Sequence, residues 1–122
     1  MSDYFDWKDF SGVYLEDSFV RHIIESENQL VFDMEFVLTK EHPLFEQPKI
    51  GEQYCYHRGI IVFSGISSVN WIEKSNIIFH DANNEEDYGN IDVLRKINGD
   101  MYEINGDFGK LRVTSSRLTI IL

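Results

Sequence analysis

The clearest pattern in the chain is the alternation of apolar with other side chains from residue 30 to residue 38. The apolar residues at every second position are Leu30, Phe32, Met34, Phe36 and Leu38. Because side chains on a β-strand point alternately to the two faces of a sheet, this spacing predicts a half-buried strand. The segment Ser18–Glu25 precedes it across a polar turn near Glu27 and Asn28, so the two segments are expected to pair as a hairpin.

Short segments of the same kind follow through the rest of the chain. Gly59 and Gly65 separate apolar runs in the middle and are expected to separate strands. The dipeptides Asn98-Gly99 and Asn105-Gly106 are strong signals for tight hairpin turns. The apolar run Ile60–Phe63 indicates a strand that is buried on both faces.

These patterns predict an all-β protein, a single antiparallel β-sandwich or partly open barrel of about nine or ten short strands. No stretch has the composition of a linker, so residues 1–122 are expected to form one domain. The first ten residues carry four aromatic side chains among acidic ones. We expect this aromatic and acidic lead-in, residues 1–10, to pack against the body of the domain.

Two segments do not fit a simple series of hairpins. Residues Glu41–Glu52 contain His42-Pro43 and Gln47-Pro48, and proline lacks the N–H that a strand needs. This irregular stretch is either a functional loop or a plain connection between two sheets. The final segment Leu118–Leu122 is apolar on both faces, which predicts a strand inserted between neighbours or buried at a dimer interface.

The charge balance restricts the classes of partner. The 122 residues include 21 acidic and 11 basic ones, and the formal net charge is −10. A chain this acidic repels phosphate backbones, so no nucleic-acid partner is expected. No apolar run approaches the ~18–20 residues of a membrane span, and the acidic, aromatic first ten residues are unlike a signal peptide. A single cysteine, Cys55, is typical of a reducing compartment, so the expected location is the cytoplasm.

Aromatic residues make up 14% of the chain and lie mostly beside acidic residues. Most of these rings are expected to fill the core. The others are candidates for binding a partner, because tyrosine and tryptophan dominate the energetics of protein interfaces and carboxylates favour a basic partner. The candidate partner-binding residues are Trp7, Glu85, Glu86, Asp87 and Tyr88.

A candidate ligand region consists of His42, Cys55 and His57. Cys55 and His57 are two positions apart in a predicted strand and therefore share a face, as a thiol and its base would need to. A buried cysteine that only packs explains the same pattern. Because no further catalytic group is recognisable, the sequence predicts no catalytic residue, no cofactor and no enzyme activity.

No metal site is expected either, because the four histidines lack the spacing of zinc ligands. The segment Asp81–Asp92 resembles a calcium-binding loop in its oxygen-bearing side chains. It has Glu86 where such a loop needs glycine, and no helices flank it. A solvated acidic turn between strands accounts for the segment.

Five short blocks of the sequence are distinctive as a set. In chain order they are Leu15-Glu16-Asp17-Ser18, Glu41-His42-Pro43, Tyr54-Cys55-Tyr56-His57-Arg58-Gly59, Asp87-Tyr88-Gly89-Asn90-Ile91-Asp92 and Gly106-Asp107-Phe108-Gly109. Together they resemble a family of small bacterial all-β proteins that has no assigned activity. The opening hairpin is also similar, more loosely, to all-β immunity proteins of bacterial toxin systems. The resemblance implies the all-β fold and supplies no catalytic residue, and Phe108 stands where the family tends to have tryptophan.

Three functional hypotheses follow. The first is a non-enzymatic, acidic protein-binding domain that meets a basic protein, as an immunity-like inhibitor would meet a basic toxin. The second is a self-associating structural domain, a homodimer paired through its C-terminal strand. The third is a small enzyme or ligand binder that uses His42, Cys55 and His57.

Overall fold

The computed structural model describes residues 1–80 and 84–122. Within them the chain forms nine strands and two short 3₁₀ helices: β1 (Ser2–Asp3), η1 (Tyr4–Asp6), η2 (Lys8–Phe10), β2 (Val13–Glu25), β3 (Gln29–Leu38), β4 (Cys55–Lys74), β5 (Phe79–His80), β6 (Glu86–Asp87), β7 (Ile91–Asn98), β8 (Met101–Gly106) and β9 (Gly109–Ile121). None of the described residues belongs to a helix that is long and apolar enough to cross a membrane.

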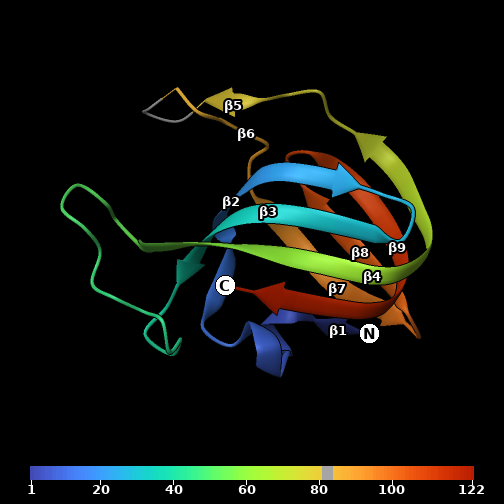
Figure 1. The fold of residues 1–122 in the computed structure, drawn as a ribbon, viewed down its shortest axis with the longest axis horizontal. Helices are drawn as coiled ribbons and strands as arrows, with labels where there is room; N and C mark the ends of the chain where they lie inside the picture. Colours follow the sequence, from blue (N-terminus) through green and yellow to red (C-terminus); the bar gives the residue numbers. More distant parts are fainter. Residues whose placement is uncertain (81–83) are drawn as a thin grey trace.

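Seven of these strands form one antiparallel sheet in the order β1-β7-β8-β9-β4-β3-β2, and β5 and β6 form a separate hairpin. Figure 1 shows that the sheet bends back on itself, with β2, β3 and the first part of β4 in front of β7 and β8. The prediction of an all-β, antiparallel fold is therefore confirmed. The described strands do not close into a barrel.

The strands are longer than the sequence pattern predicts, and β4 shows why. It runs without a break from Cys55 to Lys74, so the expected separation at Gly59 and Gly65 is wrong. Gly65 has a φ of +60°, and a Cβ at this position would lie 2.0 Å from the Ser116 hydroxyl. Glycine tolerates this conformation, so the strand bends here, close to an irregularity in the register with β9, and does not end.

The core lies between the two layers of the bent sheet. The alternating residues of β3 all point into it, and each is 2% exposed or less. The predicted half-buried strand is therefore confirmed. The other buried apolar residues in contact with this core include Val13, Leu15, Val20, Ile61, Phe63, Ile91, Leu94, Ile104, Phe108, Leu111 and Val113.

The first ten residues are built into this arrangement. Ser2 and Asp3 pair with β7, and the side chains of Tyr4 and Phe10 are 2% and 3% exposed. The Tyr4 hydroxyl accepts a hydrogen bond from the Leu15 N–H (3.0 Å) and donates one to the Glu16 carboxylate (2.8 Å). Burial raises the pKa of this phenol well above its ordinary value, so it stays a neutral donor.

A bulge in β2 is held by the buried hydroxyl of Ser18. The register between β2 and β3 is irregular between Tyr14 and Phe19, which leaves the Val37 N–H without a backbone partner at this point. The Ser18 hydroxyl accepts a hydrogen bond from that N–H (2.8 Å) and donates one to the Tyr14 carbonyl (2.7 Å). One side chain therefore replaces the missing ladder contacts.

Removing this hydroxyl should weaken the fold. In Ser18→Ala the buried Val37 N–H would lose its partner, and an unsatisfied buried donor costs about 1–3 kcal/mol. We expect the free energy of unfolding, measured by urea denaturation, to fall by about this amount. Ser67→Ala removes an exposed serine hydroxyl from β4 and should change it by less than about 0.5 kcal/mol. Equal effects of the two substitutions would show that Ser18 does not hold the bulge.

Candidate functional site

The outer face of the front layer carries four aromatic side chains around Val37, and we call these five residues the tyrosine patch: Tyr14, Phe19, Val37, Tyr54 and Tyr56. Tyr14 of β2 and Tyr56 of β4 are the two cross-strand neighbours of Val37 in β3, so these three side chains form a row. The Tyr56 ring lies 6.1 Å from that of Phe19 and 6.2 Å from that of Tyr54, measured between centroids. Val37 is only 3% exposed beneath the rings, whereas Tyr14 is 36% exposed. The patch therefore presents aromatic surface outward.

Carboxylates surround the tyrosine patch. The negative charge of Asp17, to which the Tyr54 hydroxyl is hydrogen-bonded, is the largest cause of the raised pKa of that phenol. Burial raises the pKa of Tyr56, and the charges of Glu35 and Glu52 raise it further. Three acidic side chains therefore act on two rings, and their field favours a cation over the patch.

Arg58 lies at the border of the patch. It is the cross-strand neighbour of Glu35, and its guanidinium is 3.5 Å from the carboxylate of Asp33. This ion pair lies on the same face of the sheet as Glu35. Aromatic faces beside carboxylates are the groups that hold lysine and arginine side chains in proteins.

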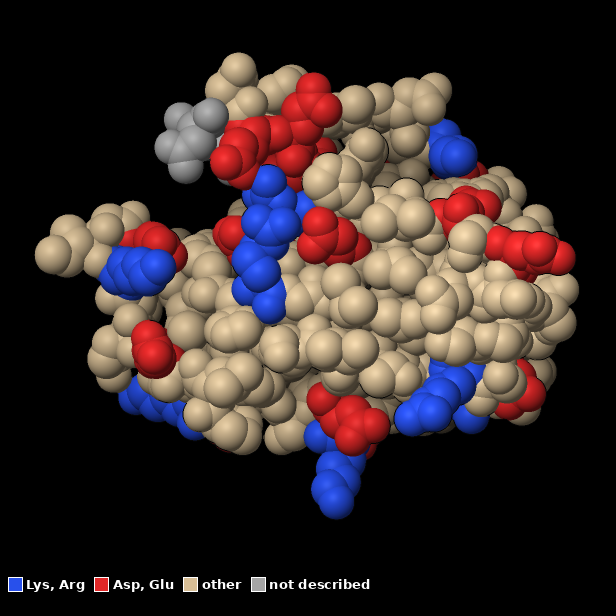
Figure 2. All heavy atoms as spheres, viewed as in Figure 1, with Lys and Arg blue, Asp and Glu red and all other residues tan. Residues whose placement is uncertain are grey.

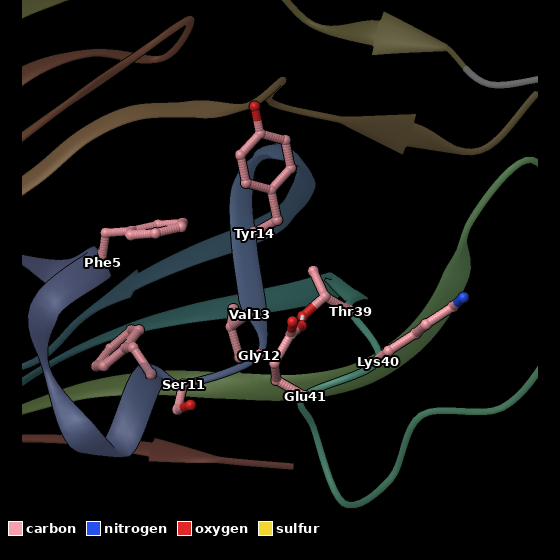
Figure 3. Close-up of a pocket in the computed structure, with 9 residues that line it drawn as sticks. Phe5, Ser11, Gly12, Val13, Tyr14, Thr39, Lys40 and Glu41 are labelled. Carbon is pink, nitrogen blue, oxygen red and sulfur yellow. Dashed lines mark hydrogen bonds between the residues drawn. The ribbon is translucent and has the colours of Figure 1, made fainter.

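An open groove adjoins the patch at Tyr14, which lines both. Its volume is about 640 Å³, and it lies between the N-terminal turn, the start of β2 and the residues that follow β3. Figure 3 shows Phe5 on one side of Gly12 and Val13, Thr39 and Glu41 on the other, and Lys40 extending away. The Thr39 hydroxyl donates to Glu41, and this hydrogen bond lowers the pKa of the carboxyl. Phe5 is 66% exposed, so the groove offers a second aromatic surface next to the patch.

The candidate ligand region predicted from the sequence lies at the end of the sheet where the β3–β4 loop leaves it. Cys55 and His57 share the inward face of β4, opposite Leu38 and Phe36, as their spacing predicts. The His42 pKa is lowered by burial and, to a smaller extent, by the charge of His57.

The thiol itself is engaged in packing. Cys55 is 9% exposed, and its sulfur accepts a hydrogen bond from the Glu46 N–H (3.4 Å). No hydrogen bond among the described residues joins Cys55 to His42 or His57. The sulfur of Cys55 therefore has its hydrogen-bond partner in the β3–β4 loop.

Trp7, the first candidate partner-binding residue, lies between η1 and η2. Its indole N–H donates to the Ser2 hydroxyl (3.0 Å), and its ring packs edge-on against Phe10 and Tyr102, at 5.5 and 6.0 Å between centroids. The ring is partly buried. Most of its surface therefore serves the packing of the N-terminal segment.

The other candidates lie in and next to β6, away from Trp7: Figure 1 shows the N-terminal turns and the β5–β6 hairpin on opposite sides of the sheet. Glu85 forms an ion pair with Arg21, and Glu86 lies 3.8 Å from His80. Figure 2 shows acidic residues gathered over this hairpin. The structure does not bring Trp7 and the hairpin together into one surface.

Asp87 of β6 and Tyr88, which follows it, are more enclosed than the sequence pattern suggests. Asp87 is only 7% exposed, and its carboxylate accepts a hydrogen bond from the Gly89 N–H (2.8 Å). The Tyr88 N–H donates to the Val20 carbonyl (2.7 Å), and the Val20 N–H donates to the Gly89 carbonyl (2.8 Å). Asp87 is therefore a turn carboxylate in a segment whose backbone is bonded to β2, and Glu85 and Glu86 remain as the exposed acids.

The acidic turn compared above with a calcium-binding loop is described only in part, because residues 81–83 lie outside the described residues. Across residues 1–80 and 84–122, no group of three or more histidine, cysteine, aspartate or glutamate side chains is placed to hold a metal ion.

The sequence contained part of the signal for the tyrosine patch. Tyr54 and Tyr56 alternate with Cys55 and His57, so their shared face follows from spacing alone. Tyr14 and Phe19 are five positions apart, and in a regular strand an odd spacing places two side chains on opposite faces. Only the bulge at Ser18 brings them to the same face, and no periodicity rule predicts that bulge.

No family model, curated protein or solved structure matches the chain. The resemblance suggested by the five sequence blocks therefore remains a prediction. The function has to be argued from the geometry of this chain.

His42 provides a pH test of the loop that borders the groove. Its Nδ1 accepts a hydrogen bond from the Leu44 N–H (3.0 Å), and its folded-state pKa is lowered. The unfolded chain therefore binds a proton more readily, and stability should fall as the pH drops from neutral through about 6.5, the ordinary histidine value. His42→Asn keeps a side-chain acceptor without this titration, so its stability should fall less over the same range in urea denaturation. Leu44→Ala changes a residue of the same loop that does not titrate, so the stability of this variant should keep the full pH dependence. An identical pH dependence in His42→Asn would contradict this role.

Proposed function

We propose that this chain is a non-enzymatic binding domain for a basic protein, and that the tyrosine patch is its contact surface. The observation that carries the proposal is that aromatic rings lie together on one outer face of the sheet and that the charges of Asp17, Glu35 and Glu52 raise the pKa values of Tyr54 and Tyr56. The face of a tyrosine ring attracts a lysine or arginine side chain, and a neighbouring carboxylate completes the contact with a charge-assisted hydrogen bond.

The distribution of charge along the chain supports a basic partner. Residues 1–90 contain 17 of the 21 acidic residues but only 6 of the 11 basic ones. The strands and loop that build the tyrosine patch all belong to this part of the chain. Long-range attraction would speed the encounter with a basic protein, whereas the aromatic contacts would slow its release.

The exposed acids of β6 have a supporting role in this proposal. Glu85 and Glu86 do not belong to the tyrosine patch, and Glu85 forms an ion pair with Arg21 of β2. They would contribute to the field that attracts the partner rather than to the contact itself. The loose similarity of the opening hairpin to immunity proteins suggests a basic toxin as one class of partner, and no similarity found in known proteins tests this suggestion.

The proposal can be tested with a hexa-arginine peptide as the probe, followed by NMR titration of the full chain. We expect the largest chemical-shift changes at Tyr14, Tyr54 and Tyr56. Tyr56→Leu should weaken binding about fivefold, because an exposed cation–π contact contributes about 1 kcal/mol. Affinity should also fall as salt is raised, since exposed charges are screened beyond roughly 8 Å at physiological ionic strength.

A matched pair of charge variants separates the patch from the overall charge. Asp17→Asn with Glu52→Gln removes two carboxylates at the patch, and Glu85→Gln with Glu86→Gln removes two at β6. Both double variants have the same net charge, so a surface that acts only through total charge would respond equally to them. We expect the first pair to weaken binding several times more than the second. Equal losses, or shifts spread over all acidic segments, would contradict the tyrosine patch as the contact surface.

A further inference from the structure

The tetrapeptide Ile-Asn-Gly-Asp occurs twice in the chain, at residues 97–100 and at residues 104–107. Its asparagines, Asn98 and Asn105, are the only ones in the sequence that a glycine follows directly. The two copies therefore have the same local chemistry. Any difference in their reactivity has to come from the structure around them.

An asparagine that precedes a glycine can react with its own backbone. The glycine nitrogen loses its proton to the solvent and attacks the side-chain carbonyl carbon. A five-membered succinimide ring closes, and the side-chain nitrogen leaves as ammonia. Water then opens the ring at either carbonyl, which gives aspartate or isoaspartate. Glycine favours the reaction because it has no Cβ to hinder the approach of its nitrogen, but the amide and the side chain must both be free to move.

The structure leaves the first copy free for this reaction. Asn98 is exposed and ends β7 opposite Met101, and Gly99 and Asp100 form the turn of the hairpin. A Cβ added to Gly99 would have no atom beyond its chain neighbours within 4 Å, so the space around this residue is open. No hydrogen bond of the Asn98 side chain or of the Gly99 N–H is found among the described residues. The attacking nitrogen and the attacked carbonyl are therefore both accessible.

The second copy is held in the sheet. Asn105 and Gly106 belong to β8, and both are paired with β7 on one side and with β9 on the other. A Cβ at Gly106 would lie 2.2 Å from the Asn90 carbonyl oxygen, so the backbone is closely packed here. The Asn105 side-chain amide donates a hydrogen bond to Glu103 (3.1 Å), which is itself only 3% exposed. Ring closure at this copy therefore requires the strand pairing to open first.

We propose that Asn98 is a modification site at which the folded chain converts its own asparagine into aspartate and isoaspartate, whereas Asn105 is protected. The conversion adds one negative charge to the turn beside Asp100. Isoaspartate also adds one carbon atom to the backbone where β7 meets the turn, next to an irregularity in the register between Lys96 and Asn98. The inference does not depend on the proposed binding of a basic protein, because the site and the tyrosine patch share no residue.

Peptide mass spectrometry of the full chain tests the difference between the two copies. The folded protein is incubated at mildly alkaline pH, which favours loss of the amide proton. Trypsin would leave both asparagines in one peptide, residues 97–110, so the chain is cut after Glu103 instead. We expect Asn98 to be converted at least about tenfold faster than Asn105, because a local opening free energy of about 1.4 kcal/mol already gives this factor.

The same incubation in denaturing urea is the control for intrinsic chemistry. Without the sheet, the two asparagines should react at similar rates, since the tetrapeptides around them are identical. Equal rates in the folded chain would overturn the proposal, because Asn105 would then not be protected. An Asn98 that reacts only in urea would overturn it as well, because the folded turn would then block the reaction.

A matched pair of glutamine variants assigns the product to one position. Asn98→Gln keeps a side-chain amide but would have to close a six-membered ring, which is much slower, so the folded variant should no longer gain negative charge on ion-exchange chromatography. Asn105→Gln should gain it at the wild-type rate, and Asn98→Asp marks the elution position of the aspartate product. An isoaspartyl methyltransferase with a labelled methyl donor should label the incubated wild type but not Asn98→Gln. Thermal melting checks that the variants fold, and a charge gain that persists in folded Asn98→Gln would contradict the assignment.

Discussion

The antiparallel pairing of β4 with β9 is the interaction on which the rest of the structure depends. It extends from Ile60 opposite Ile121 to Lys74 opposite Gly109, and both strands pass from the front layer to the back. The strands β3 and β2 are added on one side of this pair, and β8, β7 and β1 on the other. Gly59 shows how close the contact is, because a Cβ there would lie 2.3 Å from the Ile121 carbonyl oxygen. The other edge of β4 pairs with β3, and that register places Tyr56 opposite Val37 in the tyrosine patch.

The features that could be predicted from the sequence are those that depend on near neighbours. The alternation from Leu30 to Leu38 and the turn between Glu25 and Gln29 appear as expected, and the turn predicted at Asn98-Gly99 lies one residue later, at Gly99 and Asp100. The next turn lies two residues later than its dipeptide signal, at Asp107 and Phe108. Phe108 is 2% exposed, so the gain from burying its ring at this position outweighs the local preference of Asn105-Gly106.

The features that could not be predicted depend on distant parts of the chain. A glycine inside a strand pattern is compatible with a turn or with a bend, and only the approach of Ser116 shows that Gly65 is a bend. In the same way, the burial of Asp87 follows from the bonds between its segment and Val20 of β2, far away in sequence. The candidate site shows the same division. The spacing of Tyr54 and Tyr56 was visible, whereas their meeting with Tyr14 required the register of three strands.

The position of β9 has a consequence for the synthesis of this chain. β9 follows all the other strands in sequence, yet it lies at the centre of the sheet order. While a ribosome is producing the chain, β2, β3 and β4 can form a meander of neighbouring strands, but the long edge of β4 stays open until β9 has emerged. That edge includes Ile61 and Phe63, which are buried in the finished fold. Sheets rich in such non-local pairings fold slowly. The nascent protein therefore exposes an unpaired, apolar strand edge during translation. Rapid completion of the chain or a chaperone would limit aggregation through this edge.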